Sequence, residues 1–421
     1  MPTVIHGKES VHSCGVTEVV SYLQELLESC GWQNITVHPY HPGHEANGNE
    51  KQLFSLPLPG ANGYRIAVPA EIGPFNLEWV YARQLDTVVK IADVVQLHGP
   101  HQVNDHLQRA CLRHKTPTVL FLHVDDAYYI DCRIPRCLGF LRDSLKEQQH
   151  RRARRMAELA NVVVSPSRHY ARVFQNHTGF NGEVIVAPSH VRPFALMNEQ
   201  EAAVFSEQFR KGNLLVHPEA YPLIVFLGRL GPEKNCEFVL QVFAGLVELH
   251  RQEYIPGVTL PVLAFVGDSS RAYQGKLESL AKKWGIDHLV YFAGHRSHNE
   301  AMKILQISRL CLFPSTSETQ GLVAAEARLC GTPVLVPQNT ALAEFVPSQH
   351  SLLVLPQNSP QIWAASLHRL LSDSQLYQEL AEKGRAAAKQ LANPDAFLES
   401  TLNIYDLARQ QRLARQGCLP R

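Results

Sequence analysis

The hydrophobic pattern of the chain alternates between two periods almost throughout. Short runs rich in valine, isoleucine and leucine recur between longer segments in which apolar residues return every three or four positions. Nearly continuous apolar runs are typical of strands buried on both faces, as in a parallel sheet. The expected strands are PTVIHG (2–7), ITVHPY (35–40), ADVVQLH (92–98), PTVLFLH (117–123), NVVVSP (161–166), EVIVAPS (183–189), PLIVFLGR (222–229), PVLAFVG (261–267), LVYFAGH (289–295), LCLFPS (310–315), PVLVPQ (333–338) and SLLVLP (351–356).

Amphipathic helices are expected between these strands. In TEVVSYLQELLESCG (17–31), for example, Val19, Leu23 and Leu27 recur at helical spacing. Regular strand–helix alternation over 421 residues predicts an α/β protein with two doubly wound parallel-sheet domains. The expected organisation is a first domain at 1–195, a linker at 196–221 where the period is lost, and a second domain at 222–395. A final helix at 396–416 is expected to pack back onto the first domain.

Composition narrows the class of protein. Apolar residues make up 45% and charged residues 19%, so the chain is a well-packed globular protein. The formal net charge of +1 argues against a nucleic-acid binder, so any anion site must be local. Nine cysteines without a CxxC pair favour a reducing cytoplasm. No charged-then-apolar leader and no run of 18 apolar residues occurs, so membrane contact is expected only at the surface.

The segment SETQGLVAAEA (317–327) predicts an anion site. No G-x-G and no G-x-x-x-x-G-K-[ST] occurs, so dinucleotide and P-loop fingerprints are absent. A strand should end near Ser315 and a helix should begin around Gly321, which leaves the N–H groups of 319–323 pointing outward. Glu318 in the loop could accept hydrogen bonds from sugar hydroxyls, and Glu326 in the helix could bind both hydroxyls of a ribose. Alternatively, Glu318 only complements the helix dipole and Glu326 is solvated.

The segment FLGRLGPEKNCEFVLQVF (226–243) predicts a second anion-compatible element. A strand runs into Arg229, and Lys234 follows where a helix starts. Two cations at the end of a parallel strand are suited to clamping a diphosphate, and each charge-assisted bond is worth about 1.5–3 kcal/mol. The alternative is an exposed loop that carries two surface cations.

Three segments in this order and spacing resemble a known family. They are GRLGPEKN (228–235), FVGDSS (265–270) with KLESLAKKWGIDHLVYFAGH (276–295), and SETQGLVAAEARLCGTPVLV (317–336). Together they resemble retaining glycosyltransferase family 4, whose GT-B fold has two Rossmann-like domains facing across a cleft. The resemblance covers most of the second half. It implies that Arg229 and Lys234 bind the donor diphosphate, that Glu318 contacts the donor sugar and that Glu326 binds the ribose. Backbone bonds to sugar and phosphate are expected from Thr319, Gln320, Gly321 and Leu322.

The first half resembles the family less closely. HSCGVTEVVSYLQELLESCG (12–31) is similar to its glycine-rich first turn, which implies donor contact at Gly15, although the usual Gly-Gly pair reads Cys14-Gly15. LFLHVDD (120–126) is similar to the strand whose histidine faces the donor sugar, which implies this role for His123. Asp125 and Asp126 lie beside it on the acceptor side. The alternative for His123 is a capped loop residue. APSHV (187–191) replaces the family's Pro-Asn-Gly turn.

Two further segments bear on the acceptor. SLPLPGANGYRIAVP (55–69) and the variant ETQG (318–321) look like the branch that makes glycosyl-diacylglycerols and sulfoquinovosyl lipids. FLRDSLKEQQHRRARR (140–155) carries five arginines and one lysine, which on a helix could contact anionic lipid headgroups. The alternative is a solvated helix face.

The expected function is retaining hexosyl transfer from a nucleotide sugar, UDP-glucose by resemblance, to an acceptor hydroxyl. Glu318, His123, Arg229 and Lys234 are the expected catalytic residues. No cofactor or metal is expected: His38, His41 and His44 in VHPYHPGHE favour a polar loop, and Asp125-Asp126 is the nearest approach to a DxD pair. Three alternatives remain: a soluble acceptor, an epimerase or phosphorylase of the same fold, and a non-catalytic nucleotide-sugar-binding protein. The protein is expected to be cytoplasmic, with peripheral membrane contact left open.

Overall fold

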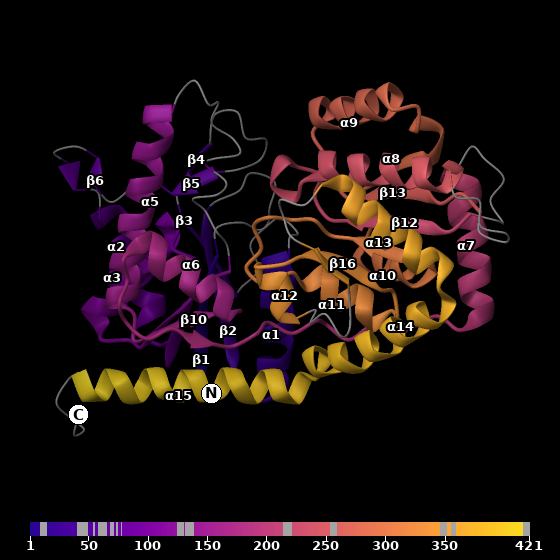
Figure 1. Cartoon of the computed structure of the whole chain (residues 1–421). Coiled ribbons are helices and arrows are strands. Elements are labelled where there is room, and N and C mark those ends of the chain that lie inside the picture. The colour runs from indigo at the N-terminus through magenta and orange to yellow at the C-terminus, as the bar shows by residue number, and fades with distance from the viewer. Residues whose placement is uncertain are drawn as a thin grey trace. The chain divides into compact units, whose positions relative to one another are not determined.

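The computed structural model describes most of the chain. The described residues are 1–8, 15–39, 49–53, 55–57, 65–67, 71–72, 75–76, 78–123, 130, 139–213, 221–252, 259–345, 352–354 and 359–415. They form two compact units, each with its own parallel sheet (Figure 1). Unit 1 comprises Met1–Arg192 and Asn393–Arg421, and unit 2 comprises Pro193–Ala392.

Unit 1 contains seven parallel strands among its described residues, in the order β11-β10-β9-β8-β1-β2-β3. These strands are β1 (Thr3–Gly7), β2 (Gln33–Pro39), β3 (Glu50–Leu53), β8 (Val94–His98), β9 (Thr118–Phe121), β10 (Val162–Ser165) and β11 (Ile185–Val186). Two antiparallel pairs join β4 (Ser55–Pro57) to β5 (Arg65–Ala67) and β6 (Glu71–Ile72) to β7 (Phe75–Asn76). The strand order reverses between β1 and β8.

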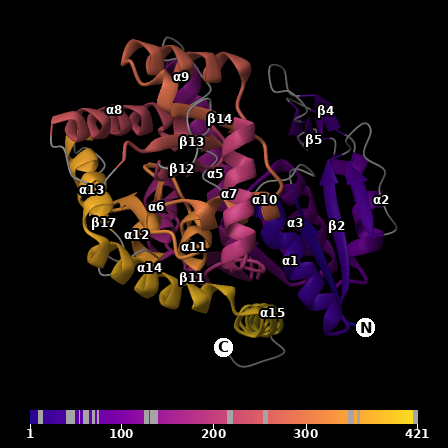
Figure 2. The same ribbon diagram turned by 90° about the vertical axis from the view of Figure 1, so that its right-hand side faces the viewer.

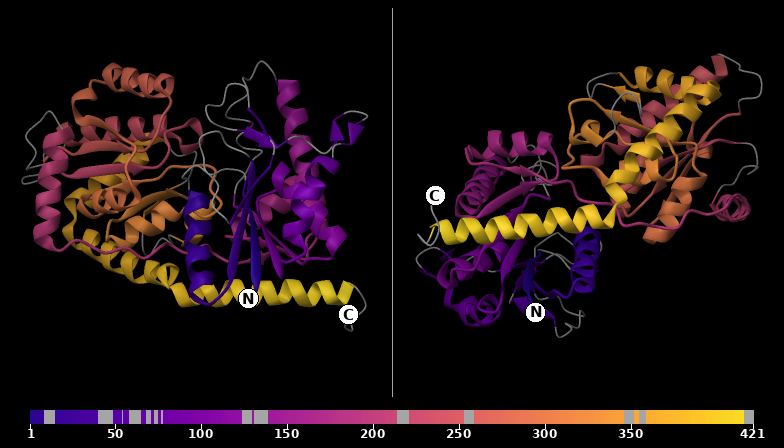
Figure 3. Two further views of the ribbon diagram at one scale, coloured as in Figure 1. Left: turned by 180° about the vertical axis from the view of Figure 1, so that it is seen from behind. Right: turned by 90° about the horizontal axis from the view of Figure 1, so that it is seen from below.

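The helices of unit 1 cover both faces of its sheet. They are α1 (Gly15–Ser29), α2 (Glu78–Val89), α3 (Gln102–His114), α5 (Gly139–Leu159), α6 (Arg168–Thr178) and α15 (Pro394–Arg415). The last helix, α15, contacts β8, β9 and β10 and packs against α1, as the view from below shows (Figure 3). Tyr405 on α15 is buried, and its hydroxyl donates a hydrogen bond to Gln96 Oε1 on β8 over 2.5 Å.

Unit 2 contains six parallel strands among its described residues, in the order β14-β13-β12-β15-β16-β17. They are β12 (Leu223–Leu227), β13 (Val262–Val266), β14 (Val290–Gly294), β15 (Leu310–Leu312), β16 (Val334–Pro337) and β17 (Leu352–Val354). Its helices are α7 (Glu199–Asn213), α8 (Cys236–Gln252), α9 (Arg271–Lys283), α10 (His298–Ile307), α11 (Leu322–Leu329), α12 (Ala341–Phe345), α13 (Pro360–Ser372) and α14 (Ser374–Ala388), with short 3₁₀ helices η2 (Pro232–Lys234), η3 (Asp287–Leu289) and η4 (Lys389–Ala392).

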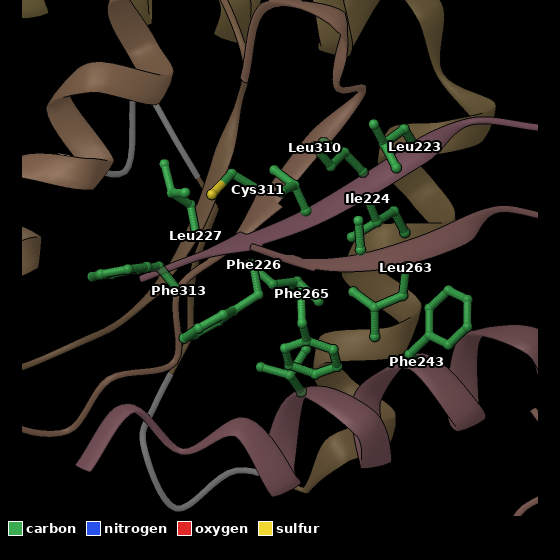
Figure 4. Packing of buried hydrophobic residues seen from close by; sticks show 14 of the residues in the cluster. Leu223, Ile224, Phe226, Leu227, Phe243, Leu263, Phe265, Leu310, Cys311 and Phe313 are labelled. Carbon is green, nitrogen blue, oxygen red and sulfur yellow. The ribbon is translucent and has the colours of Figure 1, made fainter. Parts of the chain in front are cut away.

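The core of unit 2 shows why the apolar runs form strands. Side chains from both faces of β12 are fully buried, because helices α8 and α13 cover one face and α10 and α11 cover the other (Figure 2). On the α8 side, the ring centres of Phe226 and Phe265 lie 5.6 Å apart, and Phe243 of α8 belongs to the same core (Figure 4). Each buried aromatic side chain of this kind stabilises the fold by roughly 1.5–3 kcal/mol through removal of apolar surface from water.

The expected doubly wound parallel sheets are confirmed in both units, and every run expected as a strand contains one. Strand β3 and the pairs β4–β5 and β6–β7 were not predicted. Within the segment expected as a linker, residues 199–213 form helix α7, whose Phe209 joins the core of unit 2. In the described part of the chain, no helix combines the length and the apolar composition needed to cross a bilayer.

Candidate functional site

Two loops of unit 2 meet where its strand order reverses. Strands β12 and β15 are neighbours, although α8, β13, α9, β14 and α10 separate them in sequence. In parallel sheets, ligands bind beyond the carboxyl ends of the strands at such a reversal, because the loops there diverge to opposite faces. The loop after β12 carries Arg229 and Lys234, and the loop after β15 carries Glu318 and Gly321. The topology therefore brings both sequence motifs to one edge of the sheet.

The loop after β12 is shaped by its glycines. Gly228 has φ of 145°, a region that favours glycine, and its N–H donates to Val266 O over 2.9 Å. Gly267 passes so close that a Cβ there would lie 2.1 Å from Gly228 O. This approach fixes the backbone from which Arg229 projects. The Arg229 guanidinium contacts Glu233 Oε1 over 2.8 Å, and Glu233 itself is buried.

Lys234 forms an ion pair with Glu318. Its ammonium Nζ donates to Glu318 Oε1, and both side chains are largely buried, with 18% and 12% of their surfaces exposed. The ammonium also lies 5.8 Å from the ring centre of Phe313. Asn235 Nδ2 donates to Pro314 O over 3.4 Å, which ties the two loops together a second time. A lysine and a glutamate from the two separate motifs therefore occupy one site.

The N-terminus of α11 lies in the second loop. Gly321 is the N-cap residue of the helix, with φ of 85° and ψ of 62°, and as a glycine it supplies no side-chain cap. A Cβ at Gly321 would lie 2.1 Å from Leu342 Cδ2, so only glycine fits. Gln320 is buried, Thr319 and Leu322 are half-buried, and the helix begins at Leu322. The partial positive charge of this terminus is available to an anion.

Glu326 lies one turn into α11 and has a partner that sequence reasoning missed. Its Oε1 contacts His298 Nε2 over 3.1 Å, and 14% of the Glu326 side chain is exposed. His298 is the first residue of α10, and its ring lies edge-on to Phe194. The helix α10 carries a full capping box at Ser297 and Glu300, which fixes the place of His298. Glu326 is thus a positioned carboxylate and not a freely solvated one.

Two residues of this region, Glu233 and His298, were not expected as site residues. Their contacts with Arg229 and Glu326 bring them to it. The i,i+4 spacing of Arg229 and Glu233 was the one clue in the sequence. The buried Cys236 and Cys311 thiols border the same region, and burial raises the pKa of each to about 12, so neither is a thiolate at neutral pH.

In unit 1, Gly15 and His123 lie at the carboxyl edge of the sheet. Gly15 is the first residue of α1, and His123 follows β9 by two residues. His123 Nε2 lies 2.9 Å from His98 Nδ1, and its ring stacks on Phe121 with centres 4.2 Å apart. Burial lowers the pKa of His123 to about 3, so the ring is neutral. It is therefore a buried, hydrogen-bonded histidine that follows the strand, and its contact with a donor sugar stays a prediction.

Several expected residues lie outside the described residues. These are Cys14, His41, His44, Asp125 and Asp126, together with most of the segment 55–69. Among the residues that are described, no three histidine, cysteine, aspartate or glutamate side chains gather as metal ligands do. The expectation of a metal-independent protein stays a prediction.

The arginine-rich segment forms part of helix α5. Only Ala153, Met156 and Ala157 of this helix are buried. Three arginines pair with acidic side chains: Arg154 with Glu158 and Arg155 with Asp105, each over 2.8 Å, and Arg151 with Glu147 over 3.7 Å. These pairs offset part of the positive charge that a lipid surface would attract. Phe140, at the start of the helix, is 91% exposed.

Comparison with known proteins places these features in a family context. Residues 207–387 match the family model "Glycosyl transferases group 1", and this range covers most of unit 2, including the loops that carry Arg229, Lys234, Glu318 and Glu326. The chain is 34% identical over 228 residues to D-inositol 3-phosphate glycosyltransferase of Corynebacterium urealyticum, covering 54% of this chain and 49% of that protein. It is 28% identical over 187 residues to an uncharacterized glycosyltransferase of Methanocaldococcus jannaschii, covering 44% of this chain and 45% of that protein. The chain therefore spans about half the length of the curated relatives it matches.

Solved structures extend the likeness to the whole chain. Anabaena HepE in complex with UDP and glucose superposes with a TM-score of 0.73 at 15% identity, covering 96% of this chain and all of that one. Sucrose-phosphate synthase from Thermosynechococcus elongatus superposes with a TM-score of 0.70 at 18% identity, covering 96% of this chain and 98% of that one. At these identities the likeness shows the fold alone. The predicted fold class, two Rossmann-like units of the GT-B type, is confirmed.

Proposed function

We propose that this protein is a retaining glycosyltransferase that moves a hexosyl group from a nucleotide sugar to an acceptor hydroxyl. The observation that carries the proposal is the meeting of Lys234 and Glu318 at the strand-order reversal of unit 2, beside the N-terminus of α11 at Gly321. The group 1 match over the same residues and the glycosyltransferase names of the relatives support it.

The donor diphosphate would replace Glu318 as the partner of Lys234. Lys234, Arg229 and the N–H groups at Gly321 and Leu322 would then share its negative charge. Glu318, released from Lys234, would accept hydrogen bonds from sugar hydroxyls. Glu326, held by His298, would accept from the ribose. Thr319 and Gln320 would contribute backbone contacts, with Gly15 and His123 of unit 1 at the phosphate and the sugar. Each of these roles extends the family resemblance of the motif residues.

The chemistry proposed is same-face displacement. The bond between the anomeric carbon and the phosphate oxygen breaks, the acceptor oxygen bonds to that carbon, and the acceptor proton passes to the departing phosphate. The developing negative charge would be stabilised by Arg229, Lys234 and α11, an effect commonly worth about 3–4 kcal/mol per donor removed. Cys236 and Cys311 would not attack the anomeric carbon as thiolates, because burial raises the pKa values of both thiols. No metal or other cofactor is needed for this charge balance.

UDP-glucose is the proposed donor, because the family resemblance suggests it and a structural neighbour is a complex with UDP and glucose. Two acceptor classes deserve a test. The segment 55–69 suggests a diacylglycerol, whereas the curated relatives are named for D-inositol 3-phosphate. A cytoplasmic setting fits the free thiols of Cys30, Cys111, Cys236, Cys311 and Cys330. Peripheral contact of α5 with an anionic membrane is part of the diacylglycerol alternative only.

The decisive experiment is a donor-turnover assay with purified protein. UDP- and GDP-sugars are screened for nucleotide release alone, with diacylglycerol in mixed micelles, and with inositol 3-phosphate, each with and without a chelator. We expect one donor to be cleaved only when one acceptor is present, and the chelator to have no effect. Lys234→Ala should lower turnover about 10²–10³-fold, since about 3–4 kcal/mol of charge stabilisation is lost.

Lys211→Ala is the matched control, because Lys211 also pairs with a glutamate in unit 2, Glu207, but both lie on α7, which supplies no residue of the site. It should leave turnover unchanged. A normal rate in a folded Lys234→Ala protein would overturn the proposal. If a donor raises the melting temperature and no acceptor triggers release, the protein is a nucleotide-sugar-binding protein without transfer activity on these acceptors.

A further inference from the structure

Helices α10 and α11 of unit 2 are joined by a histidine and a carboxylate. His298, the first residue of α10, places its Nε2 3.1 Å from Glu326 Oε1 on α11. An ionised carboxylate only accepts hydrogen bonds, so the imidazole N–H is the donor. With 29% and 14% of their side-chain surfaces exposed, both residues are largely buried, yet both still reach the surface. The pair therefore lies at the surface of the candidate site and not inside the core.

The imidazole of His298 is held in place from two further directions. Its backbone is fixed by the capping box that starts α10. The Phe194 ring lies edge-on to the imidazole, with ring centres 6.3 Å apart. The segment that carries Phe194 is itself tied to α10, because Gln306 Nε2 donates to Met197 O over 2.7 Å and Met197 N donates to Gln306 Oε1 over 2.8 Å. His298 is therefore a fixed donor for the carboxylate.

The Glu326 carboxylate depends on this donor. Among the residues that the structure describes, it has no hydrogen-bond or ion-pair partner other than His298. Its neighbours along α11 are short, because Ala324, Ala325 and Ala327 are buried and end at Cβ. A glutamate side chain loses rotational freedom when it is fixed. Without His298, each ligand that binds would have to fix the carboxylate again.

Two buried thiols lie near the same carboxylate and do not compete with His298. Burial raises the pKa of Cys311 and of Cys330 to about 12, and the negative charge of Glu326 raises it further. A neutral thiol is only a weak hydrogen-bond donor. The charge of Glu326 is therefore left to His298 and to a ligand that binds beside it.

The helix directs Glu326 toward the N-terminus of α11. Glu326 follows Leu322 by four positions, so the two residues share one face and lie one turn apart, about 5.4 Å along the axis. Side chains of a helix lean toward its N-terminus, which brings the carboxylate closer to the N–H groups that begin at Gly321. An anion at the helix start and two hydroxyls beside Glu326 can therefore belong to one ligand. A ribonucleotide has both groups, whereas a 2′-deoxyribonucleotide lacks one of the hydroxyls.

Stability alone does not explain the pair. Polar and charged groups lose hydration when they are buried, so apolar side chains of similar size would join two helices at least as well. The pair instead involves the helix that follows the loop after β15, next to the strand-order reversal of unit 2. A ligand that binds there gains affinity from a carboxylate that is already oriented.

We propose that His298 is a positioning residue for the donor: it holds the Glu326 carboxylate so that the site selects ribonucleotides over 2′-deoxyribonucleotides. The contact of Glu326 with the ribose rests on the function proposed above, whereas its dependence on His298 comes from the geometry of α10 and α11. His298 itself need not touch the donor.

The binding test compares each ribonucleotide with its deoxy analogue. Calorimetric titration measures the Kd of UDP, 2′-deoxy-UDP, GDP and 2′-deoxy-GDP for the unmodified protein and for His298→Leu. We expect the unmodified protein to bind one ribonucleotide about tenfold or more tightly than its deoxy analogue, because the missing hydroxyl leaves a largely buried carboxylate without its ligand partner. In His298→Leu this preference should largely disappear, through weaker binding of the ribonucleotide and with the affinity for the deoxy form unchanged.

Two further variants separate positioning from packing. The side-chain amide of His298→Gln can donate from a position near that of the imidazole Nε2, so this variant should restore most of the preference. His114→Leu is the matched control, because His114 Nε2 also contacts a carboxylate, Asp86 Oδ1, over 3.0 Å. His114 ends α3, which runs from the carboxyl end of β8 back to the start of β9, so it lies at the opposite edge of its sheet. Its nucleotide affinities should be those of the unmodified protein.

Steady-state kinetics give a second readout. A ribose contact is made equally before and during transfer, so its loss weakens substrate and transition state alike. His298→Leu should therefore raise the KM of the donor about tenfold and leave kcat near normal. Lys234→Ala should instead lower kcat, because its charge stabilises the leaving diphosphate.

Failure of the inference and failure of the proposed function give different results. If the unmodified protein binds neither UDP nor GDP and turns over no donor, the proposed function is wrong and the inference is overturned with it. If a donor is turned over but a folded His298→Leu protein keeps the preference for the ribonucleotide, the function stands and the role of His298 is wrong. Equal losses of affinity for UDP and 2′-deoxy-UDP in His298→Leu, without rescue in His298→Gln, would show a packing role and also contradict the inference.

Discussion

Single histidines in unit 1 link burial to the pH dependence of stability. His6 and His123 each have a pKa near 3 in the folded protein, against an ordinary value of 6.5, because burial penalises the charged ring. Between these values the unfolded chain binds protons that the folded chain does not. The free energy of unfolding therefore falls as pH falls from about 6.5 to about 3, by about 1.4 kcal/mol per pH unit for each such histidine.

This predicts a pH slope that depends on His6. Urea unfolding of unit 1, followed by the fluorescence of Trp32 at pH 7, 6 and 5, should give a loss of stability with acid. In His6→Gln, which cannot titrate there, the slope between pH 6 and pH 5 should be shallower by about 1.4 kcal/mol per unit. Equal slopes in the two proteins would mean that His6 is not held neutral by the fold.

Ion pairs at the residue scale are less informative about stability than about function. Lys234 and Glu318 are 84 positions apart in sequence, yet their side chains meet and both are largely buried. A buried ion pair loses much of its attraction to the cost of desolvation, so it is weak evidence for a stabilising role. A ligand that replaces Glu318 as the partner of Lys234 would explain why this pair lies at the strand-order reversal.

At the scale of elements, the turn into helix α11 depends on a single glycine. Gly321 combines a positive φ with a Cβ position that Leu342 occupies. Gly321→Ala should destabilise unit 2 by about 1–3 kcal/mol, because the alanine is strained in this conformation and its Cβ would displace the buried Leu342 side chain. It should weaken donor binding as well, since relief of this strain moves the N–H groups at the helix start.

Gly275→Ala is the matched comparison for this helix argument. Gly275 lies within α9, and a Cβ there meets nothing within 4 Å. Alanine should therefore stabilise α9 by about 0.5–1 kcal/mol and leave donor affinity unchanged. Donor titration and urea unfolding of both variants check the pair. If Gly321→Ala bound donor as tightly as the Gly275→Ala protein, the N-terminus of α11 would not be the phosphate site.

At the scale of the whole molecule, the chain returns to unit 1 through α15 after it has completed unit 2. Tyr405 and Gln96 join this helix to β8 across 309 positions of sequence, and Arg409 lies over the Trp32 ring at 5.2 Å. A small cavity of about 10 Å³ beneath α15 is bordered by Tyr405, Gln96 and the two histidines His98 and His123. The last helix therefore borders the same cavity as His98 and His123.

This predicts that α15 stabilises unit 1 selectively. Tyr405→Phe leaves the buried Gln96 Oε1 without its donor and should destabilise unit 1 by about 1–3 kcal/mol. The unfolding transition of unit 2, followed through Trp284 and Trp363, should not move. Urea unfolding of single-tryptophan variants distinguishes the units. A common shift of both transitions would show that the two units unfold as one.

Local information predicted much of the fold. Apolar runs of β-branched residues located every strand of unit 2 and all the long strands of unit 1 except β3, because two-sided burial leaves a pattern in consecutive residues. Strand β3, with the sequence EKQL, carries no such pattern, since it is an edge strand of the sheet. The residues proposed for the donor side were predicted in the same way, because Arg229, Lys234, Glu318 and Glu326 belong to short contiguous motifs.

By itself, the sequence determined the α/β class, the strands, the helix start at Gly321 and the two charged motifs on the loops after β12 and β15, since each depends on neighbours along the chain. Only the tertiary structure decided that Lys234 meets Glu318, that Glu326 meets His298, and that His6, His98 and His123 form one hydrogen-bonded row. Those meetings depend on strand order and register, which long-range packing sets and which no local pattern encodes.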